Sequence, residues 1–286
     1  HRDLHSFPTR RSSDLNGFGK LLRINPVGGG CINNGARLET DTGISFFLKT
    51  NHAAPADLFA REAEGLQALN VMHAPRVPKV HLFDRYFFLL EDLKPALRCN
   101  QYWELLGSQL AVLHNQISDR FGFQHDNYIG STHQPNPWYA NGYDFFAQQR
   151  LQFQSSLAFE HGLLEKKHLR QVERLELSLA SLIPDQPASL IHGDLWSGNI
   201  ISDKQGCPAL IDPAVYYGWA EAELAMTDLF GKLPEQFYES YQTVRPLEPG
   251  YRQRFPLYNL YHLLNHLNIF GRGYLACVKE VLDRFS

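Results

Sequence analysis

The chain has 286 residues, of which 44% are hydrophobic and 20% charged, and its formal net charge at pH 7 is −3. This composition is typical of a globular protein with enough apolar residues for a sizeable core. The charge shows no basic excess of the kind that favours nucleic acid or an anionic membrane, and no apolar run reaches the ~20 residues of a membrane-spanning helix. We therefore expect neither nucleic acid nor a membrane as a partner.

Four cysteines are scattered along the chain without paired CxxC spacing: Cys31, Cys99, Cys207 and Cys277. In a chain of this length, that pattern predicts a reducing compartment, and so a cytoplasmic location, rather than a disulfide scaffold. The first fifteen residues, HRDLHSFPTRRSSDL, are polar, basic and non-periodic. They lack the apolar core of a signal peptide, so we expect residues 1–15 to be a foreign or disordered tail.

The first third of the chain has the pattern of a small sheet with one helix. Residues 21–27 and 36–50 are predicted as strands on either side of a glycine-rich turn at 28–35. Residues 57–70 have apolar side chains at helical spacing, and residues 86–91 form an apolar run typical of a buried strand.

The rest of the chain is predicted to be mostly helical. We expect a helix around 103–113, an irregular loop at 122–142 and helix over 143–182. Short strands are expected near 188–192, 199–203 and 208–212, followed by a long amphipathic helix around 257–267. A β-rich third followed by a helical remainder predicts a two-lobed α+β fold with a cleft between the lobes. We place the N-lobe at 16–93 and the C-lobe at 94–286.

The most informative segment runs from His192 to Asp212. It contains Asp194, then Asn199 five residues later, then Asp212 thirteen residues after that. A kinase-type phosphotransferase needs one carboxylate to take the proton of the acceptor hydroxyl, and an Asn and a second carboxylate to hold Mg²⁺ on the ATP phosphates. The alternative for HGD alone is an ordinary turn, and His192 is expected to fix the loop backbone rather than act as a base.

Two upstream features agree with this interpretation. Lys49 ends an apolar strand, and Glu62, thirteen residues on, lies in the predicted helix and could orient the lysine through an ion pair. Glycines 28–30 belong to a loop whose composition suits backbone contact with phosphate, although a plain hairpin has the same composition. Cys31 lies in that loop, either as a small filler or as an oxidisable thiol that would block it.

The run LIHGDLWSGNI…ALIDPAVYYGWAEAELAM at 190–226 closely resembles the fructosamine kinase family, also called ketosamine-3-kinases, within the aminoglycoside phosphotransferase-like kinases. Further matches are FFLKTN, EAEGLQAL, YIGSTHQPNPW, FFAQQRL and LYNLYHLLNHLNIFG. The resemblance covers roughly residues 20–284. It implies a protein-kinase-like fold and ATP- and Mg²⁺-dependent phosphorylation of the sugar 3-hydroxyl of a free or protein-bound ketosamine.

Carried over by position, the resemblance implies roles for individual residues. Asp194 is the base, Asn199 and Asp212 hold metal, and Lys49 and Glu62 form the pair that orients phosphate. The resemblance also implies residues that contact nucleotide and residues that contact the substrate. Nucleotide contacts are expected at Gly29, Gly30, Cys31, Glu91 and Leu93, the last two at the hinge beside adenine, and substrate contacts at Trp196, Tyr217 and Trp219. The family's usual N-terminal helix is expected to be replaced by the tail, and Glu223 stands where Asp is common.

Two alternatives remain open on the sequence. The first is another small-molecule kinase of the same fold, acting on choline, homoserine or an aminoglycoside. The second is a nucleotide-binding pseudokinase without activity. The chain is expected to be a monomer or a homodimer.

Overall fold

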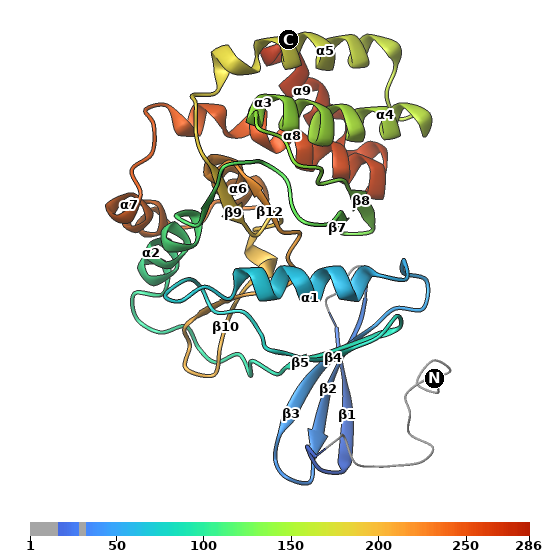
Figure 1. Ribbon diagram of the computed structural model, residues 1–286, viewed down its shortest axis with the longest axis vertical. Helices are drawn as coiled ribbons and strands as arrows, with labels where there is room; N and C mark the ends of the chain where they lie inside the picture. Colours follow the sequence, from blue (N-terminus) through green and yellow to red (C-terminus); the bar gives the residue numbers. More distant parts are fainter. Residues whose placement is uncertain (1–16, 29–32) are drawn as a thin grey trace.

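The computed structural model describes residues 17–28 and 33–286. Figure 1 shows an antiparallel sheet and helix α1 at one end of the molecule and a larger helical region at the other. This arrangement confirms the predicted α+β fold with a small β-rich lobe and a larger helical lobe. The predicted tail at 1–15 and the residues Gly29, Gly30 and Cys31 lie outside the described ranges.

The N-lobe sheet has five strands in the order β1-β2-β3-β5-β4, and all neighbouring pairs are antiparallel. Its strands are β1 (Leu21–Val27), β2 (Asn34–Thr40), β3 (Ser45–Thr50), β4 (Val80–Phe83) and β5 (Phe87–Glu91). The prediction of one strand over 36–50 is wrong, because residues 41–43 form a turn. In that turn the Thr40 N–H donates to Ile44 O at 3.0 Å. Gly43 has a φ of 77°, a conformation that glycine adopts easily and that turns of this kind require.

The two faces of this sheet have different neighbours. Leu38, Phe46 and Leu48 are buried on one face, whereas Phe47, Lys49 and the side chains opposite them in β5 lie on the face that packs against α1 (Leu58–Leu69). Side chains alternate along a strand, so the register that buries Phe46 and Leu48 also directs Lys49 toward α1. The predicted helix at 57–70 is confirmed.

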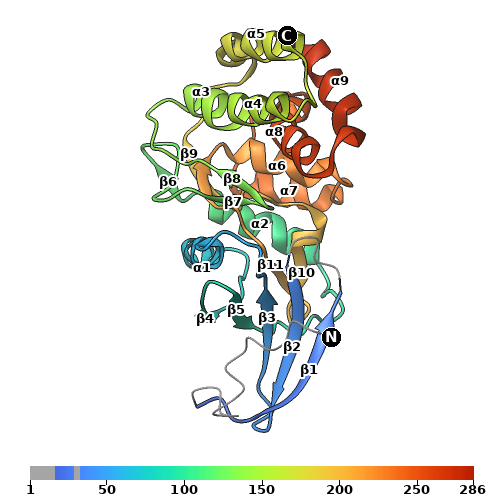
Figure 2. The same ribbon diagram turned by 90° about the vertical axis from the view of Figure 1, so that its right-hand side faces the viewer.

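The C-lobe is built from helices with short strands between them. Its helices are α2 (Tyr102–His114), α3 (Gly142–Phe145), α4 (Phe153–Glu160), α5 (Lys166–Leu182), α6 (Ala220–Leu229), α7 (Glu235–Val244), α8 (Tyr251–Phe270) and α9 (Leu275–Phe285). A π-helix (Phe146–Gln152) joins α3 to α4, and 3₁₀ turns lie at Ser197–Asn199 and Arg272–Tyr274. Helix α2 packs on α7 and α6 on α8, and Figure 2 shows α5 and α9 at the end farthest from the sheet.

The short C-lobe strands pair in small antiparallel sheets between the helices. They are β6 (Ile117–Ser118), β7 (Asn127–Ile129), β8 (Thr132–Gln134), β9 (Ala188–Ile191), β10 (Ile200–Ser202), β11 (Pro208–Leu210) and β12 (Tyr216–Gly218). Strands β9, β10 and β11 confirm the three predicted short strands. The expected loop at 122–142 contains the β7–β8 hairpin, and the expected helix over 143–182 is interrupted at 161–165, where Gly162 has a φ of 69°.

The long C-terminal helix is α8, which holds the predicted apolar face at 257–267. None of the helices within residues 17–28 and 33–286 is both long and apolar enough to cross a bilayer. The predicted boundary at 93/94 falls in the segment between β5 and α2.

Candidate active site

The loop that follows β9 is held by a buried imidazole. His192 is fully buried; its Nε2 lies 2.9 Å from Ile211 O, and its Nδ1 lies 3.3 Å from the backbone N–H of Asp194. Burial lowers the pKa of His192, so the neutral ring donates through Nε2–H and accepts at Nδ1. These contacts fit the prediction that His192 fixes the loop.

Gly193 permits a close approach that no other residue type could make. Its φ is 84°, and a Cβ at this position would lie 2.0 Å from Ala214 O. The backbone N–H of Gly193 donates to Glu223 Oε1 at 2.7 Å. The HGD glycine is therefore required by both the backbone conformation and the packing of the loop against 214.

Glu223 anchors the loop from α6 through a chain of buried groups. Its Oε2 accepts from His114 Nε2 at 2.8 Å, and His114 Nδ1 lies 2.8 Å from Tyr241 Oη. Burial raises the pKa of Glu223, but the bonds from His114 and Gly193 outweigh it and the net shift is downward. Burial also lowers the pKa of His114. An ionised Glu223 bonded to a neutral His114 satisfies both shifts. The sequence pattern predicted neither role, although a Glu inside the apolar run AELAM was a usable signal.

Asp194 and Asn199 are joined directly. Asn199 Nδ2 donates to the backbone O of Asp194 at 2.8 Å and to Asp194 Oδ2 at 3.2 Å, which leaves the amide oxygen of Asn199 available as an acceptor. Burial, followed by the nearby charge of Asp212, raises the pKa of Asp194 to about 7. A carboxylate with such a pKa can accept a proton near neutral pH.

Asp212 has a left-handed backbone, with a φ of 57°, and its side chain is 47% exposed. The backbone N–H of Ile211 donates to Asn199 O at 3.1 Å, which ties the segments of Asp212 and Asn199 together. One carboxylate oxygen of Asp212, Oδ1, forms an ion pair with Lys49 Nζ. A positive φ in a non-glycine residue is a strained conformation that often occurs at functional sites.

Lys49 forms ion pairs with residues of both lobes. Its Nζ lies 2.5 Å from Glu62 Oε1 in α1 and pairs with Asp212 from the C-lobe, while its side chain is 6% exposed. Burial by itself lowers the pKa of Lys49, but the carboxylates of Asp212 and Glu62 outweigh it and raise it. The structure thus places the predicted Lys49, Glu62 and Asp212 in one cluster, with Asp194 close enough to Asp212 to respond to its charge.

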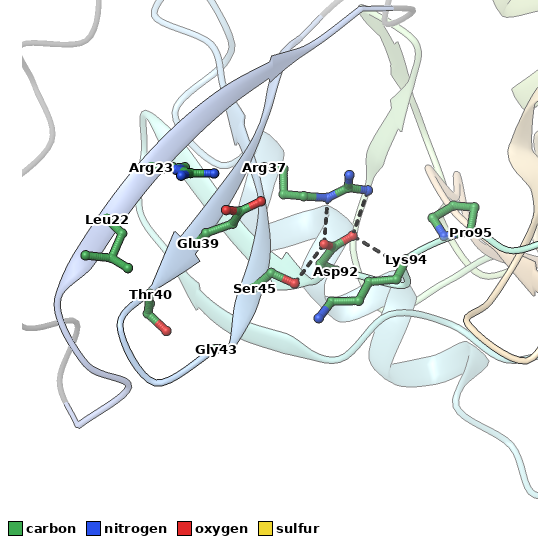
Figure 3. Close-up of a pocket in the computed structure, with 10 residues that line it drawn as sticks. All are labelled: Leu22, Arg23, Arg37, Glu39, Thr40, Gly43, Ser45, Asp92, Lys94 and Pro95. Atoms are coloured by element: carbon green, nitrogen blue, oxygen red, sulfur yellow. Dashed lines mark hydrogen bonds and ion pairs between the residues drawn. The ribbon is translucent and has the colours of Figure 1, made fainter.

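The predicted hinge residues flank a side chain that the sequence interpretation missed. Asp92 is buried, and its carboxylate accepts hydrogen bonds from Arg37 Nη2 at 3.2 Å, Ser45 Oγ at 2.8 Å and the backbone N–H of Lys94 at 3.1 Å (Figure 3). It also forms an ion pair with Arg37, whose Nε lies 2.7 Å from Asp92 Oδ2. These bonds tie the hinge to β2 and β3 beside a cavity of about 510 Å³. Leu93 is 5% exposed.

The side chain of Glu91, the other predicted hinge residue, takes part in ion pairs that connect the two lobes. Its carboxylate pairs with Arg76, and Arg76 Nη1 also lies 3.0 Å from Asp203 Oδ2 near the β10–β11 turn. The contacts made by Glu91 and Asp92 therefore fix the course of the hinge backbone relative to both lobes.

The three predicted substrate aromatics lie in different environments. Trp196 is 37% exposed beside the Asp194 loop. It makes an edge-type contact with Phe230, with the two ring centroids 6.1 Å apart. Tyr217 is half-buried and packs against the exposed ring of Trp138 at 6.1 Å. Trp219 is only 3% exposed and packs in the core among Tyr143, Phe146 and other aromatic rings. We therefore withdraw Trp219 as a substrate contact, because its ring stabilises the core.

The acidic and amide groups suit a magnesium ion shared with phosphate. No cluster of three or more His, Cys, Asp or Glu side chains that could hold a metal occurs within the described ranges. Mg²⁺ commonly takes only one or two carboxylates and completes its shell with phosphate oxygens and water. The free amide oxygen of Asn199 and the second carboxylate oxygen of Asp212 match that requirement.

Comparison with known proteins shows the family. A family model described as fructosamine kinase matches residues 10–286. A Synechocystis sp. protein named as a ketoamine kinase is 42% identical over 263 residues, which cover 90% of this chain and 88% of that protein. An Arabidopsis thaliana protein named as a chloroplastic protein-ribulosamine 3-kinase is 38% identical, with 93% of this chain and 83% of that protein covered.

Solved structures agree with these relatives. A Thermobifida fusca structure named for fructosamine-3-kinase superposes with a TM-score of 0.85 at 32% identity and covers 93% of each chain. A choline kinase structure from Streptococcus pneumoniae, at 17% identity and a TM-score of 0.60, covers 93% of this chain and 94% of that one and shares the fold alone. With matching over nearly its whole length, the chain belongs to the fructosamine kinase family.

Proposed function

We propose that this protein transfers the γ-phosphoryl group of ATP to the 3-hydroxyl of a ketosamine, with Asp194 as the base. The observation that carries the proposal is the meeting of Lys49 and Glu62 from the N-lobe with Asp194, Asn199 and Asp212 from the C-lobe. Membership of the fructosamine kinase family supports the sugar acceptor.

The residues take distinct parts in this reaction. The acceptor hydroxyl oxygen bonds to the γ-phosphorus as the bond to the β-phosphate oxygen breaks, and the hydroxyl proton passes to Asp194. Asn199 and Asp212 would hold Mg²⁺, which when bound neutralises charge on the phosphates. Lys49, oriented by Glu62, positions phosphate oxygen, and the backbone at Glu91 and Leu93 is assigned to adenine.

The acceptor side is assigned to Trp196, whose half-exposed ring lies two residues from Asp194. An aromatic face can pack against the apolar face of a sugar. Tyr217 remains a predicted contact. Its ring packs with Trp138 rather than with Trp196 among the ring contacts of the described residues, so it would meet a more distant part of the substrate. Cytoplasmic location and the monomer or homodimer state also remain predictions.

The test is ATP turnover with a panel of acceptors. We expect ADP release with fructoselysine, with the phosphate located on the 3-oxygen by NMR, and little turnover with choline, homoserine or an aminoglycoside. Asp194→Asn should lose at least about 10³-fold in kcat, because removing a general base and its positioned charge costs several kcal/mol in the transition state. Preference for choline, or near-normal turnover by Asp194→Asn, would refute the assignment.

A separate measurement addresses the pseudokinase alternative. Mg-ATP should raise the melting temperature of both the wild-type protein and Asp194→Asn, because a ligand that binds only the folded state stabilises it. Binding without turnover of any acceptor in the panel would favour a pseudokinase.

A further inference from the structure

Two cysteines far apart in the sequence lie side by side near the hinge. Cys99 is in the segment between β5 and α2, and Cys207 is in the turn between β10 and β11. The backbone N–H of Cys99 donates to Gly206 O at 3.0 Å, so Cys99 is directly opposite the residue that precedes Cys207. The Cys99 thiol is close enough to Cys207 to help raise the pKa of the Cys207 thiol.

The backbone around both cysteines is held firmly. Ala96 N–H donates to Asp203 O at 3.1 Å, and Tyr102 Oη donates to Ile201 O at 2.9 Å. Gly206 has a φ of 80°, and a Cβ there would lie 2.2 Å from Leu97 O. Residues 96–102 thus pack closely along residues 201–206. This packing holds the backbones of Cys99 and Cys207 next to each other.

Both thiols can be reached by a small reagent. Cys99 and Cys207 are free and partly exposed, and neither takes part in the proposed phosphoryl transfer. A bond between two sulfurs requires Cα atoms about 4.4–6.8 Å apart and a specific dihedral angle. The backbone bond from Cys99 to the residue before Cys207 favours such a short separation. Burial and the neighbouring Cys99 raise the pKa of Cys207. Reaction at neutral pH would therefore be slow, and a higher pH should speed it by raising the fraction of thiolate.

We propose that Cys99 and Cys207 form a reversible intramolecular disulfide. The oxidant is a small disulfide such as oxidised glutathione. One thiolate attacks a glutathione sulfur and releases one glutathione thiol; the second thiolate then attacks the protein sulfur of the mixed disulfide and releases the other. The protein loses two protons and two electrons, and glutathione disulfide becomes two thiols. The bridge would fasten the hinge linker to the β10–β11 hairpin.

Peptide mapping tests the connectivity directly. The full chain is incubated with oxidised glutathione at pH 8.5, alkylated and digested with trypsin. We expect the peptides 99–120 and 205–232 to be linked, and the intact mass to fall by about 2 Da as two thiol hydrogens are lost. Cys99→Ser and Cys207→Ser should each abolish the linked peptide, whereas Cys277→Ser, an exposed cysteine on α9, should keep it.

Thermal unfolding gives a second readout that does not depend on the proposed kinase activity. The oxidised protein should melt several degrees higher than the reduced protein, because the bridge restricts the unfolded chain, and dithiothreitol should reverse the shift. Cys99→Ser should show no such shift. Glutathione adducts on separate cysteines, a bridge to Cys31 or Cys277, or an oxidised form that melts no higher than the reduced form would each overturn the proposal.

Discussion

The two halves of the proposed active site are held in place by different kinds of interaction. In the C-lobe half, Asp194 is carried by a loop whose backbone is bonded to the buried side chains of His192 and Glu223. In the N-lobe half, Lys49 is held by ion pairs to Glu62 on α1 and to Asp212 of the C-lobe. The first half is fixed within one lobe, whereas the second depends on charges from three separate elements.

This difference has a physical consequence. A buried hydrogen-bond network that is fully satisfied holds a backbone in one geometry, since breaking any member leaves an unpaired polar group. An ion pair between separate elements responds to a change of charge at either end. The geometry of the C-lobe half therefore rests on hydrogen bonds within one lobe, and that of the N-lobe half rests on charges from both lobes. Three sets of variants test this comparison, and a fourth test lies outside both halves.

The largest effect is expected from Lys49→Met, which removes the charge that joins the lobes. We expect a loss of about 10³-fold in kcat/KM, or ~4 kcal/mol, together with lower stability, because Glu62 and Asp212 are left unpaired. Steady-state kinetics and circular dichroism measure both. Lys49→Arg, which keeps a charge but cannot keep the geometry, should fold and still lose about 10²-fold. Lys20→Met, an exposed position in the same lobe, is the control. Activity retained in Lys49→Arg would contradict the N-lobe assignment.

The second test breaks the C-lobe half through Glu223→Gln. The amide cannot accept from both His114 and Gly193 as a carboxylate does, so we expect a loss of ~2 kcal/mol in unfolding free energy and about tenfold in kcat, with the KM for ATP nearly unchanged. Glu221→Gln is a matched control, because Glu221 is equally buried on α6 but pairs with Arg254 instead of the loop. It should lose stability and keep kcat. Equal kcat values in the two variants would show that Glu223 does not position the loop.

The third test concerns the hinge between the halves. Asp92→Asn weakens the bonds to Arg37 and Ser45, so the hinge backbone should hold adenine less well. We expect the KM for ATP to rise about fivefold, which corresponds to ~1 kcal/mol, while kcat stays within twofold. Ser45→Ala, which removes one of the bonds, should give a smaller rise. A fall in kcat without a change in KM would place Asp92 outside nucleotide binding.

The smallest effect is expected from Glu176, which lies outside both halves of the site. Its titration shows how the stability of the fold changes with pH independently of the site. Burial, with Glu173 nearby, raises the pKa of Glu176 on α5 to about 7 from an ordinary value of 4.5. The folded state then holds a proton that the unfolded state has lost, so stability should fall as pH rises from about 4.5 to 7. Glu176→Gln should remove that fall and gain ~1 kcal/mol at pH 8 after allowance for solvent screening. Urea unfolding at pH 5 and pH 8 measures it, and an unchanged pH slope would contradict the assignment.

Much of the site was predictable because its chemistry is local. The spacing of Asp194, Asn199 and Asp212, and the order of Lys49 and Glu62 before them, are properties of the linear chain. The pairing of Lys49 with Glu62 was expected from their order along the chain. Strand alternation, which directs Lys49 to the face that α1 covers, explains the contact in the structure. Helices with clear apolar periodicity were also placed correctly, whereas the turn at 41–43 and the β7–β8 hairpin were missed because short turn signals are weak.

Other features could not be predicted because they depend on long-range packing. Trp219 lies in a motif beside the active-site loop, yet its ring belongs to a core assembled from residues 121–146 and 258. Glu223, His114 and Tyr241 come from three helices and meet only where α2, α6 and α7 pack. Asp92 is an ordinary acidic residue in the sequence, and its partners in β2 and β3 are set by the sheet register.

The sequence by itself determined the residue types of the proposed site, their order along the chain and the family to which the chain belongs. Those properties rest on local spacing and side-chain identity, which the linear chain carries completely. Only the tertiary structure decided which interactions hold each half of the site, which aromatic rings are exposed, and that the segments of Cys99 and Cys207 lie side by side. Those properties depend on burial and on contacts between distant segments, which exist only once the chain has folded.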